Sequence, residues 1–228
     1  INLIFITNNL KNFFLKEYKI KPHNTSVLSS VSNLNFNYPK LRNNVSNFKI
    51  GYFGLLNKSR GTDFILKLSL LDSKNTYFVF GGDKKYINFI KKKIFHRNII
   101  LNEYLPYKNI KKKMNEMDLL IMPYEKRVSA GGNFGDISKF TSPMKLFDYL
   151  ASSKPIIVSS LPVLREVLKD KQNCIFLNNL NIYQWKLAIQ KLSNNFSLRE
   201  IISKNNFFLS KKYNYNLRVK KMFQNLNI

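Results

Sequence analysis

The chain has 228 residues and a formal net charge of +25, and 44% of its residues are hydrophobic. This hydrophobic content can bury a sizeable core, which excludes an intrinsically disordered chain. No apolar run reaches the roughly 18 residues that a membrane span needs, and the opening residues lack the basic start and cleavage site of a secretory signal. The chain begins at Ile1 rather than Met, so we expect either that its front was removed or that it is a piece of a longer protein.

The basic charge allows nucleic acid or anionic lipid as a partner. The lysines are spread along the chain, with short runs only at 91–93 and 111–113, and the sequence has no zinc-finger spacing, RNA-recognition motif or helix-turn-helix. We therefore expect no nucleic-acid partner and favour contact with an anionic membrane surface. The single cysteine, Cys174, excludes an internal disulfide or thiolate metal cluster and suits the cytoplasm. We expect no metal site.

Residues 1–47 differ from the rest of the chain. They predict a short strand, a helix, an irregular or strand-like stretch and a polar linker. From Phe48 onward, short apolar runs alternate with amphipathic stretches. The predicted strands are 48–56, 76–82, 98–105, 118–124, 155–160 and 173–178. This alternation predicts an α/β fold, a Rossmann-like parallel sheet covered by helices on both faces, with ligands bound at the carboxyl ends of the strands. Residues 213–228 predict a basic terminal helix.

The stretch 138–166 predicts a loop, a helix, a buried strand and a second helix. Ser142 can cap the first helix, with Pro143 at its first helical position. A helix N-terminus that follows a glycine-rich loop is a place to hold a phosphate or diphosphate. Lys145 can add positive charge there, and the Asp148 carboxylate can accept hydrogen bonds from sugar hydroxyls. The alternative is an amphipathic helix without a ligand.

The segment SPMKLFDYLASSKPIIVSSLPVLREVL resembles the nucleotide-binding signature of family 4 retaining glycosyltransferases, which have the two-domain GT-B fold. The resemblance implies that Asp148 binds the donor ribose and that Ser142, Met144 and Lys145 lie against the diphosphate. Many family members carry a glutamate where this chain has Phe140, so the resemblance assigns no catalytic residue. It also implies that no metal cofactor is required.

Weaker resemblances extend to other loops. GLLNKSRGTDF is similar to a family loop whose basic residues reach the diphosphate, which implies that role for Arg60 and Lys58; the alternative is a solvated basic turn. NEYLPY is similar to the segment that holds the base, near Tyr104 and Leu105.

Other residues are interpreted by their place in the pattern. The loop with Glu125, Gly131 and Gly132 can face the donor sugar. We expect Asp118 to cap or end the preceding helix, and the pair at 165–166 to form a structural ion pair.

In the GT-B fold, the resemblance assigns residues 1–47 to the end of an N-terminal acceptor domain, 48–212 to the nucleotide-sugar-binding domain, and 213–228 to a helix that crosses back. It implies transfer of a sugar from a nucleotide diphosphate donor to a lipid-linked or polysaccharide acceptor, on the cytoplasmic side and possibly at the inner membrane face. We expect this chain alone to be inactive. The alternative function is a non-catalytic domain that binds nucleotide-sugar or polyanions.

Overall fold

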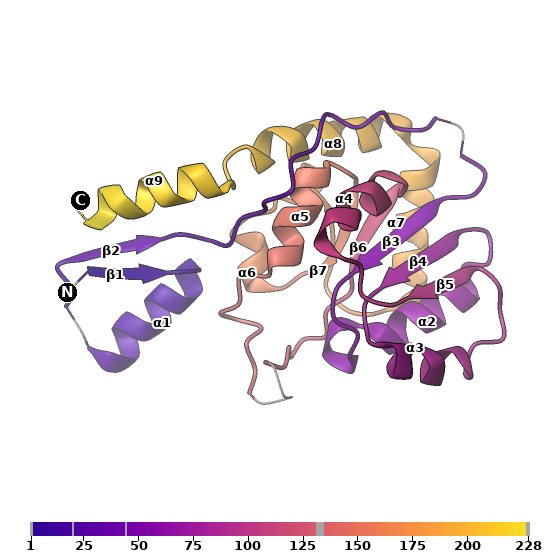
Figure 1. The fold of residues 1–228 in the computed structure, drawn as a ribbon, viewed down its shortest axis with the longest axis horizontal. Coiled ribbons are helices and arrows are strands. Elements are labelled where there is room, and N and C mark those ends of the chain that lie inside the picture. Colours follow the sequence, from indigo (N-terminus) through magenta and orange to yellow (C-terminus); the bar gives the residue numbers. More distant parts are fainter. Residues whose placement is uncertain (1, 20, 44, 131–134, 227–228) are drawn as a thin grey trace.

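The computed structural model describes residues 2–19, 21–43, 45–130 and 135–226. Its main feature is a parallel, six-stranded sheet (Figure 1). In sheet order the strands are β5 (Ile99–Asn102), β4 (Thr76–Phe80), β3 (Lys49–Phe53), β6 (Leu119–Met122), β7 (Ile156–Ser159) and β8 (Ile175–Leu177). The strand order reverses between β3 and β6, so the loops after these two strands lead away from each other.

Helices cover both faces of this sheet (Figure 1). One face packs against α2 (Thr62–Leu71), α3 (Lys84–Lys91) and α7 (Ile182–Asn194); the other packs against α4 (Tyr107–Asn115), α5 (Met144–Ser152) and α6 (Pro162–Arg165). Alternate strand residues serve the two cores: Tyr52 faces the α2 side and Phe53 the α5 side. A further helix, α8 (Phe196–Ser210), packs on α5. The predicted Rossmann-like α/β fold is confirmed.

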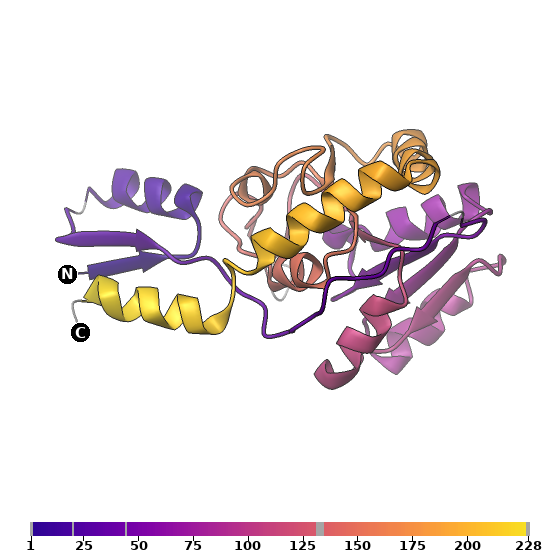
Figure 2. The same cartoon turned by 90° about the horizontal axis from the view of Figure 1, so that it is seen from above.

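A smaller unit lies at one end of the molecule. Its parallel strands β1 (Asn2–Phe5) and β2 (Asn24–Val27) lie between α1 (Asn8–Tyr18) and α9 (Tyr215–Leu226), which occupy opposite faces (Figures 1 and 2). The first and last segments of the chain therefore lie side by side. Among the described residues, no helix is long and apolar enough to cross a membrane.

Asp118 and Ser142 were both predicted to cap or end a helix, and both predictions are wrong. Asp118 does not cap α4. Its carboxylate accepts hydrogen bonds from the guanidinium of Arg42 and from the backbone N–H of Lys49, and so joins the linker to β3 and β6. Ser142 does not cap α5, whose N-cap is Pro143, because its hydroxyl accepts the N–H of Ser30.

The predicted ion pair at 165–166 is also wrong. The side chain of Arg165 donates to Ser160 and lies over the ring of Phe176, whereas the carboxylate of Glu166 accepts the backbone N–H groups of Asn8 and Asn9. Glu166 thereby offers negative charge to the N-terminus of α1, where a helix favours it. Glu166 therefore ties the small unit to the large one, while Arg165 contacts Ser160 and Phe176 within the large unit.

Candidate functional site

The carboxyl edge of the sheet is open between β3 and β6. The register pairs these strands only at Ile50 with Leu119 and Gly51 with Leu120. Beyond this point, the hydroxyl of Tyr149, from α5, accepts the N–H of Phe53 at 2.8 Å and reaches the carbonyl of Ile121. Helix α5 is thus fixed with its N-terminus at the point where the strand order reverses, the place where parallel α/β sheets bind ligands.

Two cationic side chains, Arg60 and Lys145, converge at this point; we call them the cation pair. Arg60 ends the short 3₁₀ helix η1 (Lys58–Arg60) that follows β3, and Lys145 lies in the first turn of α5. The Arg60 NH1 and Lys145 Nζ atoms are buried, and within the described part of the chain neither has a hydrogen-bond partner. The sequence-predicted pair is therefore brought together, without a protein anion against either atom.

Aromatic rings surround the ammonium group of Lys145. Its Nζ lies 3.8 Å from the ring centroid of Tyr52 and 5.4 Å from that of Tyr124. The side chain passes over Gly54, where an added Cβ would lie 2.7 Å from Lys145 Cε, so only glycine leaves room for it. Ring faces attract a cation but accept no conventional hydrogen bond from it. The ammonium therefore keeps donors for a ligand.

Without a ligand, the two positive charges of the cation pair are unfavourable, because both are buried and they repel each other. Burial, and then the charge of Arg60, lower the pKa of Lys145 well below its ordinary value. Burial raises the pKa of Tyr124 to about 12, and Arg60 opposes that rise. Isolated buried charges are costly unless an opposite charge reaches them. A ligand with negative charge would relieve this cost, so the geometry is that of an anion site.

The N-terminus of α5 adds to this site. Its N-cap, Pro143, makes no side-chain capping hydrogen bond, and Met144, at the first helical position, is 58% exposed. Uncapped amides at a helix start attract anions. Ser142 lies on the other side of this turn, where its hydroxyl and carbonyl bind Ser30. Ser142 is therefore less available to a ligand than the sequence predicted.

Asp148 lies one turn further along α5 and faces a different group. Its Oδ1 accepts the hydroxyl of Ser32 at 2.6 Å. Burial raises the pKa of Asp148 to about 6, and the Ser32 hydrogen bond opposes that rise. Tyr107 is also close, since the Asp148 charge contributes to the raised pKa of its hydroxyl. The structure thus places Asp148 beside Ser32, which precedes β3, and near Tyr107, at the start of α4.

The predicted base segment follows β5. The N–H of Tyr104 donates to the carbonyl of Gly82 at 3.2 Å, and Tyr104 is 53% exposed, while Leu105 packs on the core below α5. Gly82 belongs to the tight turn after β4, whose Asp83 caps α3. The segment therefore lies at the same edge as the cation pair, next to the loop after β4.

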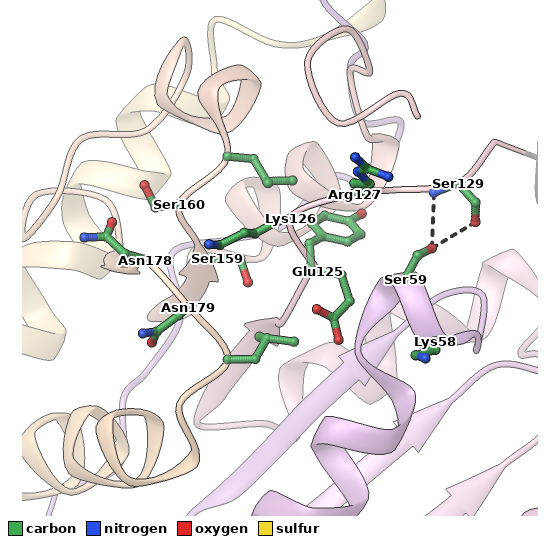
Figure 3. A pocket seen from close by; sticks show the side chains of 13 residues that line it. Lys58, Ser59, Glu125, Lys126, Arg127, Ser129, Ser159, Ser160, Asn178 and Asn179 are labelled. Carbon is green, nitrogen blue, oxygen red and sulfur yellow. Dashed lines mark hydrogen bonds between the residues drawn. The ribbon is translucent and has the colours of Figure 1, made fainter. Parts of the chain in front are cut away.

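A cavity of about 810 Å³ lies beside the cation pair, between the loops that follow β6, β7 and β8 (Figure 3). Lys58 and Glu125 line it, together with Tyr124. The N–H of Glu125 donates to the carbonyl of Ser59, which joins the loop after β6 to η1. Gly131 and Gly132, predicted with Glu125, lie outside the described residues.

Sequence reasoning missed the far wall of this cavity, which consists of Ser159, Ser160, Asn178 and Asn179. The signal was available, because Ser159, Ser160 and Asn178 end two predicted strands, Asn179 follows directly, and the carboxyl ends of parallel strands share one edge. The position where the family often carries a glutamate, Phe140, packs its ring 4.8 Å from that of Phe13 in α1. It therefore supports the small unit.

Comparisons with known proteins agree with this geometry. Residues 35–207 match the family described as "Glycosyl transferases group 1". Among solved structures, the fold is similar to that of S. aureus TarM in complex with fondaparinux, α-GlcNAc-glycerol and UDP (TM-score 0.74, 16% identity). The match covers 100% of this chain and 44% of the TarM chain.

Two further structures share the fold. They are sucrose-phosphate synthase from Thermosynechococcus elongatus (TM-score 0.76, 12% identity, 99% of this chain and 57% of that one) and WaaG, a glycosyltransferase involved in lipopolysaccharide biosynthesis (TM-score 0.70, 15% identity, 97% and 61%). The chain therefore spans about half the length of these structures. No curated protein matches the sequence.

Proposed function

The chain belongs to the group 1 glycosyl transferase family, and we propose that it is the part of a retaining, family 4 enzyme that binds a nucleotide diphosphate sugar. The observation that carries the proposal is the cation pair. Two buried cationic atoms, Arg60 NH1 and Lys145 Nζ, have no hydrogen-bond partner in the part of the chain that the structure describes, and they converge at the reversal of the strand order beside an uncapped helix start. A diphosphate supplies the negative charge that this arrangement lacks.

With the diphosphate at the cation pair, the positions of the base and the ribose follow. The base lies against the backbone of Tyr104 and Leu105, and Asp148 takes the ribose hydroxyls, exchanging the Ser32 hydroxyl for those of the ligand. The charged groups stay fixed while the bond from the sugar to the diphosphate breaks and negative charge grows on the leaving diphosphate. Fixed donors aimed at developing charge lower the barrier. This role requires no metal ion.

The proposed acceptor is lipid-linked or a polysaccharide, in surface polysaccharide synthesis on the cytoplasmic side of the membrane. One surface supports contact with anionic lipid: Phe95 is 94% exposed and Phe89 54%, next to the lysine run 91–93. Exposed aromatic rings with lysines suit a lipid interface. Phe95→Ser should lower co-sedimentation with phosphatidylglycerol vesicles, and equal binding by the two proteins would contradict this contact.

The proposed domain division is 1–47, 48–212 and 213–228, with sugar transfer in a cleft against a further domain. Much of the rate of a transfer reaction comes from holding both reactants in place. We therefore expect donor binding without sugar transfer from the 228-residue chain. Transfer from a radiolabelled donor to membrane extract by this chain alone would contradict the division.

Calorimetry with UDP and GDP tests the donor site. Arg60→Ala and Lys145→Ala should each weaken the bound diphosphate by about 1.5–3 kcal/mol, the value of a hydrogen bond to a charged group. Lys113→Ala is the matched control, because Lys113 is an exposed cation paired with Glu116 on α4. Unchanged affinity in both site variants would overturn the proposal.

Salt separates this function from polyanion binding. A nucleotide-sugar that binds the pocket should raise the melting temperature at physiological salt. A polyanion held by the general basic surface should lose its effect steeply as salt rises. Stabilisation that disappears on reaching physiological salt would favour the polyanion-binding alternative.

A further inference from the structure

The hydroxyl of Ser32 binds the carboxylate that the proposed function gives to the ribose. It donates to Asp148 Oδ1 at 2.6 Å, although the two residues lie 116 positions apart in the sequence. A serine hydroxyl and a ribose hydroxyl offer a carboxylate the same interaction, which is a neutral O–H donor. Without a ligand, the chain itself therefore fills part of the site that Asp148 would provide for a nucleoside.

Ser32 is held in this position by its own neighbours. It is 7% exposed, its hydroxyl accepts the N–H of Leu34 at 2.9 Å, and its N–H donates to the carbonyl of Tyr213 at 3.3 Å. A parallel bridge also pairs Ser32 with Asn214. Because the hydroxyl oxygen accepts from Leu34, its only proton is directed at Asp148.

Ser32 also lies where the two connections between the small and the large unit meet. One connection is the chain after β2, and the other joins α8 to α9; Figure 2 shows them side by side at the boundary between the units. Residues 29–34, which we call the junction segment, contact α9 through the carbonyl of Ser29, which accepts the side chain of Arg218 at 3.1 Å. They contact α5 through the hydrogen bond to Asp148. A change at Asp148 therefore reaches the boundary between the units.

A ribose can replace Ser32 with a gain in hydrogen bonds. Burial raises the pKa of Asp148 to about 6, and the Ser32 hydrogen bond opposes that rise, so the charged carboxylate depends on the donors around it. A ribose brings two neighbouring hydroxyls, whereas Ser32 brings one. The nucleoside must nevertheless break an existing hydrogen bond, and part of its binding free energy is lost in this exchange.

From these contacts we propose that Ser32 is an internal competitor for the ribose, which lowers the affinity for nucleosides and couples their binding to the junction segment. A nucleoside that takes Asp148 releases Ser32 and weakens the hold of α5 on residues 29–34. A diphosphate without a ribose binds the cation pair and leaves the Ser32 contact intact. The inference rests on the proposed function.

Calorimetry on Ser32→Ala tests the competition. Titrations with UDP, GDP and pyrophosphate would be done at about pH 8, where the Asp148 carboxylate is charged because its pKa is about 6. We expect Ser32→Ala to bind UDP or GDP about three- to tenfold more tightly, the value of one hydrogen bond, and to bind pyrophosphate with unchanged affinity. Equal or weaker nucleotide binding would overturn the competition, because a serine that only oriented Asp148 for the ligand would give that result.

A double variant shows whether Ser32 acts through the carboxylate. In the Asp148→Ala background, Ser32→Ala should leave the nucleotide affinity unchanged, because the competition needs Asp148. A gain in affinity that persists in this background would overturn the proposal.

Ser210→Ala is the matched control. Ser210 lines the same cavity as Ser32, beside the junction segment, but its hydroxyl donates to the carbonyl of Phe207 at 2.8 Å. This variant should bind nucleotides like the wild type. Tighter binding by Ser210→Ala as well would mean that any loss of a hydroxyl at the boundary acts in this way, and would contradict a specific role of Ser32.

Hydrogen exchange tests the coupling to the junction segment. Saturating UDP or GDP should make the amides of Ser32 and Leu34 exchange faster than saturating pyrophosphate does, because their partners are loosened when Asp148 is taken. Mass spectrometry of peptides that cover residues 29–34 measures the rates. Equal rates with the nucleotide bound overturn the coupling alone. Failure of the wild type to bind UDP, GDP or pyrophosphate instead overturns the donor site and, with it, the competition.

Discussion

The two edges of the six-stranded sheet treat buried cations differently. At the amino edge, Arg199 is 1% exposed and donates to three backbone carbonyls, and Lys154 donates to the carbonyl of Asn115. Arg42 there is paired with Asp118. At the carboxyl edge, Arg60 NH1 and Lys145 Nζ have no hydrogen-bond partner within the described residues.

This difference separates cations that stabilise the fold from cations that are available to bind a ligand. The amino-edge cations complete the fold, because each of them ends on an acceptor that the chain itself supplies. At the carboxyl edge, Lys145 lies against Gly54 and the ring of Tyr52, and neither Arg60 NH1 nor Lys145 Nζ has a hydrogen-bond acceptor among the described residues. A group that a fold positions but does not satisfy is available to a ligand, and perturbed charges cluster at such sites. Substitutions at the two edges should therefore differ in sign.

The largest effect is expected for Asp118→Ala. This carboxylate pairs with Arg42, accepts the N–H of Lys49, and raises the pKa values of Lys154 and Arg199 against the effect of burial. Its removal should lower the free energy of unfolding by roughly 3 kcal/mol, the low end for a broken buried ion pair because Arg42 is half exposed. Urea unfolding measures this loss. A loss no larger than that of a surface pair would contradict the comparison.

Asp148 should give a pH-dependent effect of roughly 3 kcal/mol at most. Its folded pKa of about 6 lies above the ordinary value of 3.8, so between these values the folded chain binds more protons than the unfolded one. The contribution of Asp148 to stability therefore falls as pH rises from about 4 to about 6. Asp148→Asn should remove this fall in a series of urea titrations.

A second substitution of Asp148 tests the proposed contact with the ribose. Asp148→Ala should weaken UDP or GDP more than it weakens pyrophosphate, which has no ribose. Equal losses for both ligands would show that Asp148 acts through the fold or the electrostatic field instead.

Lys145→Met should act in the opposite sense to Asp118→Ala. Methionine keeps the length of the side chain and removes a desolvated charge that Arg60 opposes. Without ligand, the free energy of unfolding should stay equal or rise by up to about 1 kcal/mol, since the lost contact with Tyr52 offsets part of the gain. A fall of that size or more would mean that the chain already satisfies the ammonium group.

The smallest effect is expected at the surface pair of α4. Lys113 and Glu116 are partly exposed, and their atoms approach to 2.9 Å. Glu116→Ala should change the free energy of unfolding by less than about 0.5 kcal/mol, and high salt should reduce the effect further. The Glu116→Ala variant gives the baseline against which the changes in the free energy of unfolding at both edges of the sheet are compared.

The local pattern of the sequence determined the element order, the parallel sheet and the residues at its carboxyl edge. Runs such as 155–158 are typical of buried parallel strands, and strand ends in a parallel sheet meet at one edge. From this, the convergence of Arg60 with Lys145 could be predicted. The same rule could have identified Ser159 and Asn178, which lie at the carboxyl ends of two predicted strands.

Only the tertiary structure decided which polar groups have partners. Ser142, Asp118 and Glu166 each bind a segment that lies more than 60 positions away along the chain. Sequence patterns report local periodicity and caps, and they do not record which distant segment approaches a side chain. The sequence therefore predicted Ser142 as a helix cap, whereas its hydroxyl accepts the N–H of Ser30. Among the described residues, the buried polar atoms of Lys145 and Ser159 have no hydrogen-bond partner. Sequence patterns could not predict this, because the lack of a partner depends on everything that surrounds the side chain in the folded protein.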